Sequence, residues 1–191
     1  MTRPRVAAIV TTYFPRSHAD VIVTKLLEGY DLYGVATEPR LEVASLYMDQ
    51  IAPNDVGLEL AAKHGVPIFD SVGEAIAVGV DGVLVIGEHG RYPSNEAGQK
   101  LYPRRRLFDA SVAALVGLGR AVPIFVDKHL SWSFGNARRM YETAERLGMP
   151  LLAGSSLPLA WRVPPLILPI ECQVDGALAL GYSDLEAYGF H

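Results

Sequence analysis

Short, uninterrupted apolar runs alternate with longer segments of helical spacing along most of this chain. The runs occupy residues 6–10, 32–36, 66–69, 83–86, 122–126 and 151–153. Apolar side chains at consecutive positions are typical of strands that are covered on both faces. Strands separated by helices indicate right-handed parallel crossovers. The sequence therefore predicts an α/β fold, a doubly wound parallel sheet of the Rossmann-like kind, over residues 1–155.

The segments between these runs carry helix signals. A candidate N-cap at Ser17 precedes Ile22, Leu26 and Tyr30, which follow one another in four-residue steps on one helix face. Ser71 and Glu74 form a capping-box pattern for another helix. Three more helices are expected over residues 54–64, 108–118 and 137–147.

Two connections do not fit the simple alternation. Residues 38–53 and 88–106 are much longer than the roughly two to six residues usual for links in such folds. Each is either a functional loop on a rigid scaffold or a surface insertion.

Charge and composition exclude several classes of function. The formal net charge is −4 and the pI is about 5.7, so there is no strong positive field to hold a polyanion, and nucleic-acid binding is not expected. The single cysteine, Cys172, cannot form an internal disulfide, which fits a reducing, cytoplasmic compartment. The apolar stretch 151–170 contains Arg162 and four prolines, so no membrane span is expected.

Polar side chains follow several of the predicted strands. Ligands of open parallel sheets bind outside the carboxyl ends of the strands, so the residues at those ends are the candidates for a site. They are Thr11, Thr12, Tyr13, Phe14, Arg16 and His18 after the first strand, Glu38 after the second, Glu88 and His89 after the fourth, and Asp127, Lys128 and His129 after the fifth. We expect these loops to meet at one edge of the sheet.

The loop after the first strand contains no glycine, although a glycine fingerprint normally lets the backbone approach a pyrophosphate. Tyr13, Phe14 and Pro15 stand there instead. The N-terminus of the following helix, assisted by Arg16, could still hold an anion. The alternative is that the aromatic side chains pack and the loop binds nothing. Any dinucleotide is therefore expected to bind weakly or in a shifted pose.

Asp127, Lys128 and His129 form the most informative triplet. A lysine at the end of a buried strand is desolvated and close to other charges, which suits a proton donor or an orienting cation. The alternative is an exposed Asp–Lys pair of small energetic value. The histidines have no metal-binding spacing, so no metal is expected, and a site made by Glu88, His89, Asp127 and His129 is the alternative.

Four segments together resemble a known family. They are Ala-Ala-Lys-His-Gly-Val-Pro-Ile-Phe-Asp-Ser at 61–71, Val-Asp-Gly-Val-Leu-Val-Ile at 80–86, Val-Asp-Lys-His-Leu-Ser at 126–131 and Leu-Gly-Met-Pro-Leu-Leu-Ala-Gly-Ser at 147–155. The chain is similar over about residues 5–165 to the N-terminal half of the Gfo/Idh/MocA oxidoreductases, the family of glucose–fructose oxidoreductase and inositol dehydrogenase. There the fifth strand ends in Glu-Lys-Pro, with the lysine beside nicotinamide and substrate, and residues 127–129 are a variant of this motif. Residues 162–165, Arg-Val-Pro-Pro, are similar to the family's Arg-x-x-Pro element.

The resemblance implies an NAD- or NADP-linked oxidoreductase acting on a sugar, polyol or related hydroxy compound. The catalytic residues would be Lys128, Asp127 and His129. The cofactor-binding residues would be Thr11, Thr12, Tyr13, Phe14, Arg16, Glu38, Glu88, His89 and Arg162. Two alternatives stay open. One is a Rossmann-like enzyme without dinucleotide that performs acid–base or hydrolytic chemistry, with or without the assistance of a metal. The other is a non-catalytic binding module.

Residues 156–191 form an apolar C-terminal extension. Pro158, Pro164, Pro165 and Pro169 disfavour a long helix before residue 170. The segment is too short for the family's second α/β domain, so the expectation is either a shortened relative or part of a longer protein. Because soluble monomers rarely expose so much apolar surface, we expect burial against the first domain, in a second domain or in another chain, and predict a homo-oligomer or another partner.

Overall fold

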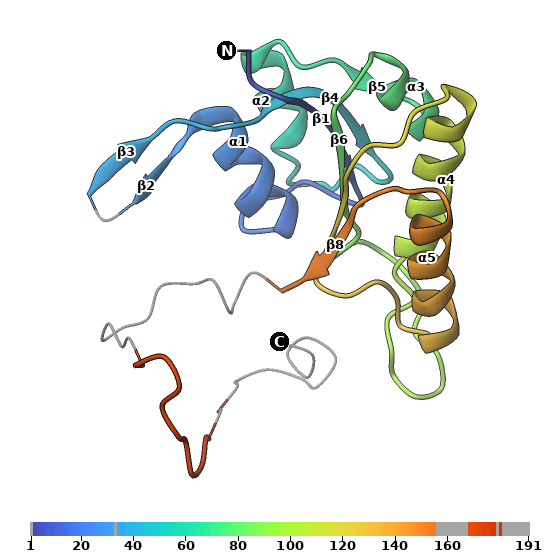
Figure 1. The fold of residues 1–191 in the computed structure, drawn as a ribbon. Helices are drawn as coiled ribbons and strands as arrows, with labels where there is room; N and C mark the ends of the chain where they lie inside the picture. The colour runs from blue at the N-terminus through green and yellow to red at the C-terminus, as the bar shows by residue number, and fades with distance from the viewer. Residues whose placement is uncertain (1, 33, 156–167, 179, 181–191) are drawn as a thin grey trace.

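The computed structural model describes residues 2–32, 34–155, 168–178 and 180 (Figure 1). Its main sheet contains β1 (Arg5–Val10), β4 (Glu42–Met48), β5 (Ile68–Phe69), β6 (Gly82–Ile86), β7 (Ile124–Asp127) and β8 (Leu151–Gly154). The spatial order is β5-β4-β1-β6-β7-β8, and every neighbouring pair is parallel. The winding direction reverses between β1 and β6, as in doubly wound nucleotide-binding folds. The predicted fold class is confirmed.

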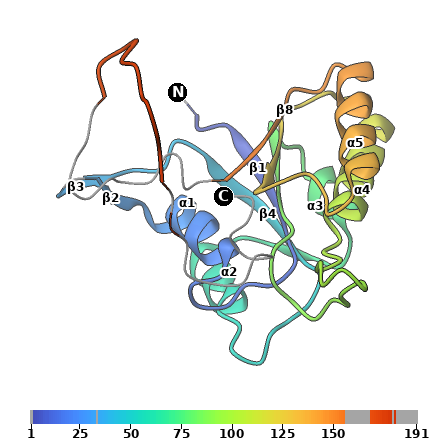
Figure 2. The same cartoon turned by 90° about the horizontal axis from the view of Figure 1, so that it is seen from below.

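Helices cover both faces of this sheet (Figures 1 and 2). The π-helical turn η1 (Asp20–Thr24), α1 (Lys25–Glu28) and α2 (Gly57–His64) lie on one face, and α3 (Val72–Ala77), α4 (Arg104–Gly117) and α5 (Phe134–Arg146) lie on the other. Successive side chains of β1 point to opposite faces. Val6, Ala8 and Val10 therefore pack in the core of the first face, while Ala7 and Ile9 pack in the core of the second. This two-sided burial explains the continuous apolar runs.

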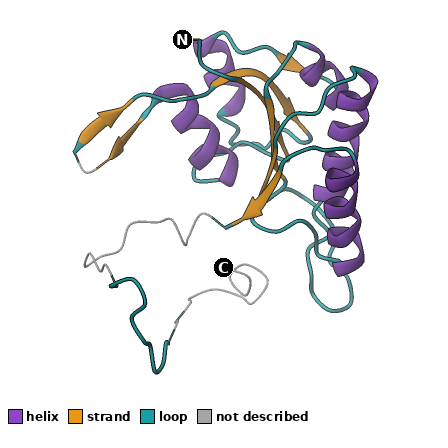
Figure 3. Ribbon diagram, viewed as in Figure 1, coloured by secondary structure: helices purple, strands orange, loops and turns teal. Residues whose placement is uncertain are grey.

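The strand predicted over residues 32–36 is not part of the main sheet. β2 (Tyr30–Leu32) and β3 (Val35–Thr37) form an antiparallel hairpin that projects from the body of the molecule (Figures 1 and 3). The strand that pairs with β1 in the main sheet is β4 instead. It lies within residues 38–53, which the sequence predicted to be a connection. The reason is burial: Val43 and Leu46 are enclosed next to β1, whereas Val35 is 65% exposed.

Most of the other predicted elements are present with shifted ends. The helix start predicted at Ser71 is confirmed, since Ser71 Oγ accepts from the Glu74 amide at 3.2 Å; the Glu74 carboxylate accepts from the Ser71 hydroxyl at 2.8 Å. The first helical segment is shorter than expected and ends before Tyr30, which begins β2. Within the described parts of the chain, no helix is long and apolar enough to cross a membrane.

Candidate functional site

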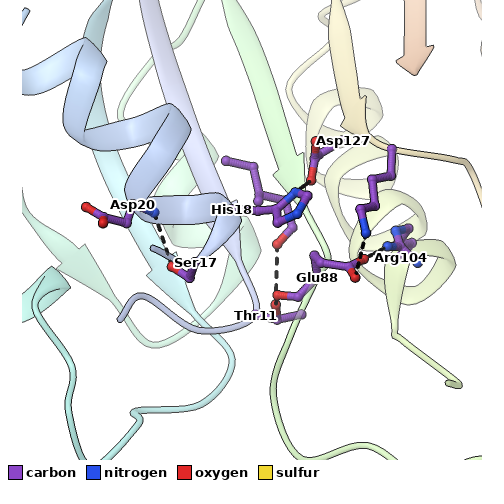
Figure 4. Close-up of polar contacts among 9 residues, drawn as sticks. Thr11, Ser17, His18, Asp20, Glu88, Arg104 and Asp127 are labelled. Carbon is purple, nitrogen blue, oxygen red and sulfur yellow. Dashed lines mark hydrogen bonds and ion pairs between the residues drawn. The ribbon is translucent and has the colours of Figure 1, made fainter. Parts of the chain in front are cut away.

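The loops that follow β1, β6 and β7 meet at the carboxyl edge of the sheet, as the topology predicts. The Thr11 amide, just after β1, donates to the Ile86 carbonyl at 3.1 Å. The Thr11 hydroxyl donates to the Glu88 carbonyl at 2.5 Å. His18 reaches across to Asp127 at the end of β7 (Figure 4). The edge therefore brings together side chains that are about a hundred residues apart in sequence.

Backbone strain gathers at the same edge. Arg16, His89 and Lys128 have φ values of 67°, 69° and 67°, in the left-handed region that non-glycine residues rarely adopt. Each lies in a loop that follows a strand of the site: β1, β6 and β7 respectively. Such conformations cost of order 1–3 kcal/mol and persist where the surrounding structure imposes them, often at functional sites.

A buried charge cluster is centred on Glu88. One oxygen of its carboxylate, Oε1, accepts from Lys128 Nζ at 3.0 Å, and the other accepts from Arg104 Nη2. The side chains of Glu88, Lys128 and Arg104 are 6%, 4% and 1% exposed. The Lys128 ammonium is thus held inside the protein, and an exposed Asp–Lys pair is excluded.

Arg104 was not anticipated from the sequence. It is the first residue of α4, and its guanidinium lies over the Tyr102 ring, 5.2 Å from the centroid. Burial lowers the pKa of Arg104, and the nearby carboxylates of Glu88 and Asp127 oppose that change. No local pattern distinguishes Arg104 from Arg105 and Arg106, so only the helix orientation selects it.

Next to this cluster, His18 and Asp127 form a close pair. Nδ1 of His18 lies 2.5 Å from Oδ2 of Asp127, whose side chain is 1% exposed. The His18 ring also contacts the His89 ring edge-on, at 5.2 Å between centroids. Burial lowers the pKa of His89, and His18 lowers it further.

His129 lies immediately after Lys128 and is partly buried. Burial lowers the pKa of His129 to about 4, and the cation of Arg104 acts in the same direction. His129 is therefore neutral near pH 7 and contributes no charge to the edge.

The loop after β1 is closed on itself. The amides of Phe14 and Arg16 donate to Ser17 Oγ at 3.2 Å and Asp20 Oδ2 at 2.7 Å, and the Ser17 amide donates to the Phe14 carbonyl at 2.9 Å. Tyr13 is fully buried, with its hydroxyl 2.8 Å from that of Thr24. The amides of Phe14, Arg16 and Ser17 are thus already bonded, and Tyr13 and Phe14 stand where a glycine loop leaves its backbone open, so these residues do not fit a pyrophosphate in the manner of a glycine loop.

A cavity of about 470 Å³ lies beside this loop, on the β4 side of the edge. Its lining includes Thr12, Phe14, Gln50, Asn54, Gly90 and Arg91. The Thr12 hydroxyl is buried and has no hydrogen-bond partner within the described residues. Lys128, Asp127 and His18 do not line this cavity; Phe14 does, and its ring contacts His89, which contacts His18.

Glu38 does not belong to the site, which corrects the sequence prediction. It is exposed and precedes β4, so it lies toward the amino end of that strand. Asp49 is the acid that follows β4, and it was missed because β4 itself was missed. Its carboxylate accepts from Tyr47, Tyr92 and Arg106, at 2.8, 2.6 and 2.6 Å. Although burial opposes them, these bonds lower the pKa of Asp49.

The remaining predicted site residues have mixed outcomes. The edge contains Thr11, Thr12, Tyr13, Phe14, Glu88, His89, Asp127, Lys128 and His129. Arg16 is in the same loop but its side chain is exposed, and Arg162 lies outside the described residues. Among the described residues, no group of three or more histidine, cysteine or acidic side chains could hold a metal ion, and the Glu88 carboxylate of the alternative metal site pairs with Lys128 and Arg104 instead.

No protein-family model and no curated protein sequence matches this chain. Its fold does match solved structures. UDP-N-acetylglucosamine 3-dehydrogenase GnnA from Acidithiobacillus ferrooxidans aligns with a TM-score of 0.52 and 16% identity, over 81% of this chain and 39% of the other. A Gfo/Idh/MocA family oxidoreductase from Vibrio cholerae aligns with a TM-score of 0.50 and 24% identity, over 79% of this chain and 38% of the other.

GenD2 from gentamicin A biosynthesis, solved in complex with NAD, aligns with a TM-score of 0.50 and 20% identity, over 81% of this chain and 35% of the other. This chain therefore spans less than two fifths of the length of these proteins. At these identities the likeness establishes the fold alone. At that level the resemblance to Gfo/Idh/MocA oxidoreductases is confirmed.

Proposed function

We propose that this chain supplies the Rossmann-like part of an NAD- or NADP-linked oxidoreductase that acts on a sugar, polyol or related hydroxy compound. The observation that carries the proposal is the buried ammonium of Lys128, at the end of β7 and on a left-handed backbone. Small-molecule ligands of such sheets bind at the carboxyl edge, where Lys128 lies. Its left-handed backbone is a conformation that is found often at functional sites.

In this proposal Lys128 binds and orients a hydroxyl of the substrate. Glu88 holds the ammonium at 3.0 Å, and Arg104 holds Glu88 from the other side. This two-sided support limits the positions that Nζ can take, which is what an orienting group requires. Asp127 and His129, on either side of Lys128 in sequence, complete the polar surroundings of the substrate.

The dinucleotide is the cofactor of this proposal, because one matched structure contains NAD and another, biliverdin reductase from Synechocystis, contains NADP+ at a TM-score of 0.50 and 16% identity. When bound, it would supply the hydride chemistry. The closed loop 11–18 does not accept a pyrophosphate on its backbone. We therefore assign the cofactor a position over the cavity beside Thr12 and Gln50, displaced from the position that a glycine loop would give it. Its affinity should be weaker than micromolar.

Calorimetric titration of the full chain with NAD and with NADP tests the proposal. We expect saturable binding of one dinucleotide, lost when Thr12→Trp fills the cavity and retained when the exposed Lys63 is changed to alanine. With candidate polyols, Lys128→Ala should weaken binding or turnover. Absence of dinucleotide binding, or an unchanged Lys128→Ala variant, would contradict it. Micromolar or tighter binding, with the pyrophosphate on Thr12 and Tyr13, would overturn the shifted pose.

A second candidate function is acid–base chemistry without a dinucleotide. It is favoured by the closed loop after β1 together with the pair of His18 and Asp127. Binding of a hydroxy compound in the absence of any effect of NAD or NADP on thermal stability would select this candidate, because a ligand of the folded state raises its melting temperature.

A further inference from the structure

We propose that His18, oriented by Asp127, is the proton acceptor of this edge and takes the proton of the ligand hydroxyl that Lys128 binds. The ligand part of this inference rests on the proposed function. The pair itself rests on the geometry of two side chains that lie on β7 and on the loop before η1.

The contact with Asp127 selects one form of the His18 ring. A buried carboxylate only accepts hydrogen bonds, so the neutral ring carries its hydrogen on Nδ1, 2.5 Å from Oδ2. The lone pair is then on Nε2. The His18 side chain is 24% exposed, and within the described residues no hydrogen bond to Nε2 is formed. Nε2 is thus the basic atom available to a ligand.

The local structure holds His18 in this position. Ser17 is fully buried, and its hydroxyl accepts from the amides of Phe14 and Asp20, both at 3.2 Å. Ala19, on the other side, is buried in the core below η1. His18 therefore stands between two anchored residues, and its ring lies against Asp127 (Figure 4).

Three segments bring ionisable groups to the edge where His18 lies. Asp127 faces the ring from β7, while Glu88 and His89 come from the loop after β6 and Lys128 follows Asp127. His89 stays neutral at pH 7, because burial lowers its pKa, and so it does not repel a second imidazolium. In the transfer the ligand O–H bond breaks and an N–H bond forms at Nε2. Asp127 stabilises the imidazolium, and the ammonium of Lys128 stabilises the alkoxide.

His64 provides a matched control in the same molecule. Its side chain is also 24% exposed, and it lies 3.4 Å from a carboxylate, that of Glu28. Glu28 is 37% exposed, whereas Asp127 is 1% exposed. The two histidines therefore differ in how firmly the carboxylate is buried and held.

Diethyl pyrocarbonate, which acylates an unprotonated imidazole nitrogen, tests the assignment without substrate or cofactor. On the full chain, with peptide mapping by mass spectrometry, we expect His18 to react faster than His64, because Asp127 fixes the lone pair on the partly exposed Nε2. Asp127→Asn should bring His18 to the rate of His64, and Glu28→Gln should leave His64 unchanged. Equal rates in the wild type, or no effect of Asp127→Asn, would overturn the assignment.

Nitrogen NMR of the unmodified protein supplies a measurement that needs no variant at Asp127. We expect the Nδ1–H form of His18, with Nε2 unprotonated; an Nε2–H form would overturn the proposal. If the oxidoreductase assay succeeds, His18→Gln should lower kcat with little change in KM, whereas a purely structural role would leave kcat unchanged. Failure of dinucleotide binding would contradict the proposed function, but it would not affect the acylation and NMR results for His18, which need no cofactor.

Discussion

At the scale of single residues, the buried carboxylate of Glu88 compensates two buried cations, Arg104 and Lys128. Removing one partner of a buried ion pair leaves a charge without compensation, and that costs far more than losing an exposed pair. The Glu88 side chain should therefore matter more to folding than either of its partners.

Glu88→Ala should lower the free energy of unfolding by about 3–5 kcal/mol, since Lys128 and Arg104 would both lose their carboxylate. Lys128→Met leaves Glu88 paired with Arg104 and should cost about 1–2 kcal/mol. Urea unfolding followed by circular dichroism measures both. The control is Glu28→Ala, which breaks an exposed pair with Lys63 and should cost much less than Glu88→Ala. Equal losses for Glu88→Ala and Glu28→Ala would contradict the argument.

His129 should make stability depend on pH. In the folded chain burial lowers the pKa of His129 to about 4, whereas the unfolded chain takes up the proton near about 6.5. Between these values the unfolded state binds more protons, so the free energy of unfolding falls as the pH is lowered. We expect a lower urea midpoint at about pH 5 than at about pH 7.

Replacing His129 by asparagine should reduce that difference between the two midpoints. The interpretation fails if the His129→Asn variant shows the full wild-type difference.

At the scale of elements, the start of α2 is set by how closely it approaches the loop after β1. A Cβ on Gly57 would lie 2.7 Å from Cδ1 of Tyr13 and 2.9 Å from Sδ of Met48. Tyr13 is fully buried and cannot move aside without disturbing its hydrogen bond to Thr24. The aromatic residue that closes the loop therefore requires a glycine in the neighbouring helix.

Gly57→Ala should lower the free energy of unfolding by about 1–3 kcal/mol through overpacking. The matched control is Gly117→Ala at the end of α4, where an added Cβ meets nothing within 4 Å. It should be neutral or stabilise by up to about 1 kcal/mol, because alanine favours the helix. A Gly57→Ala variant as stable as the wild type would show that Tyr13 is more loosely packed than the distances indicate.

At the scale of the whole molecule, apolar surface remains exposed on the single chain. Leu152 of the edge strand β8 is 67% exposed. In the described part of the C-terminal segment, Ile170, Leu178 and Leu180 are 95%, 84% and 89% exposed. These exposed apolar side chains are available for burial against another protein surface.

We expect the full chain to self-associate in sedimentation velocity. The double variant Ile170→Glu with Leu180→Glu should shift it toward the monomer, whereas Val116→Glu, at an exposed apolar position of α4, should not. A wild-type chain that sediments as a single monomer would contradict this prediction.

The sequence by itself determined the architecture, because the signals that specify it are local. Continuous apolar runs such as residues 83–86 and 122–126 favour strands buried on both faces, and the Ser71–Glu74 pattern marks a helix start without reference to the rest of the chain. The position of Asp127 and Lys128 at the carboxyl edge follows from the end of such a strand. The absence of glycine in the loop after the first strand can also be read directly from the sequence.

Only the tertiary structure decided which apolar run pairs with β1, and which polar side chains meet. Residues 32–36 and 42–48 are both plausible strands locally, and β4 prevails because burial between β1 and β5 removes more apolar surface from water than the exposed hairpin does. The contacts of Arg104 with Glu88 and of His18 with Asp127 join residues far apart in the chain. They depend on the orientation of α4 and of the loop before η1, and packing sets those orientations.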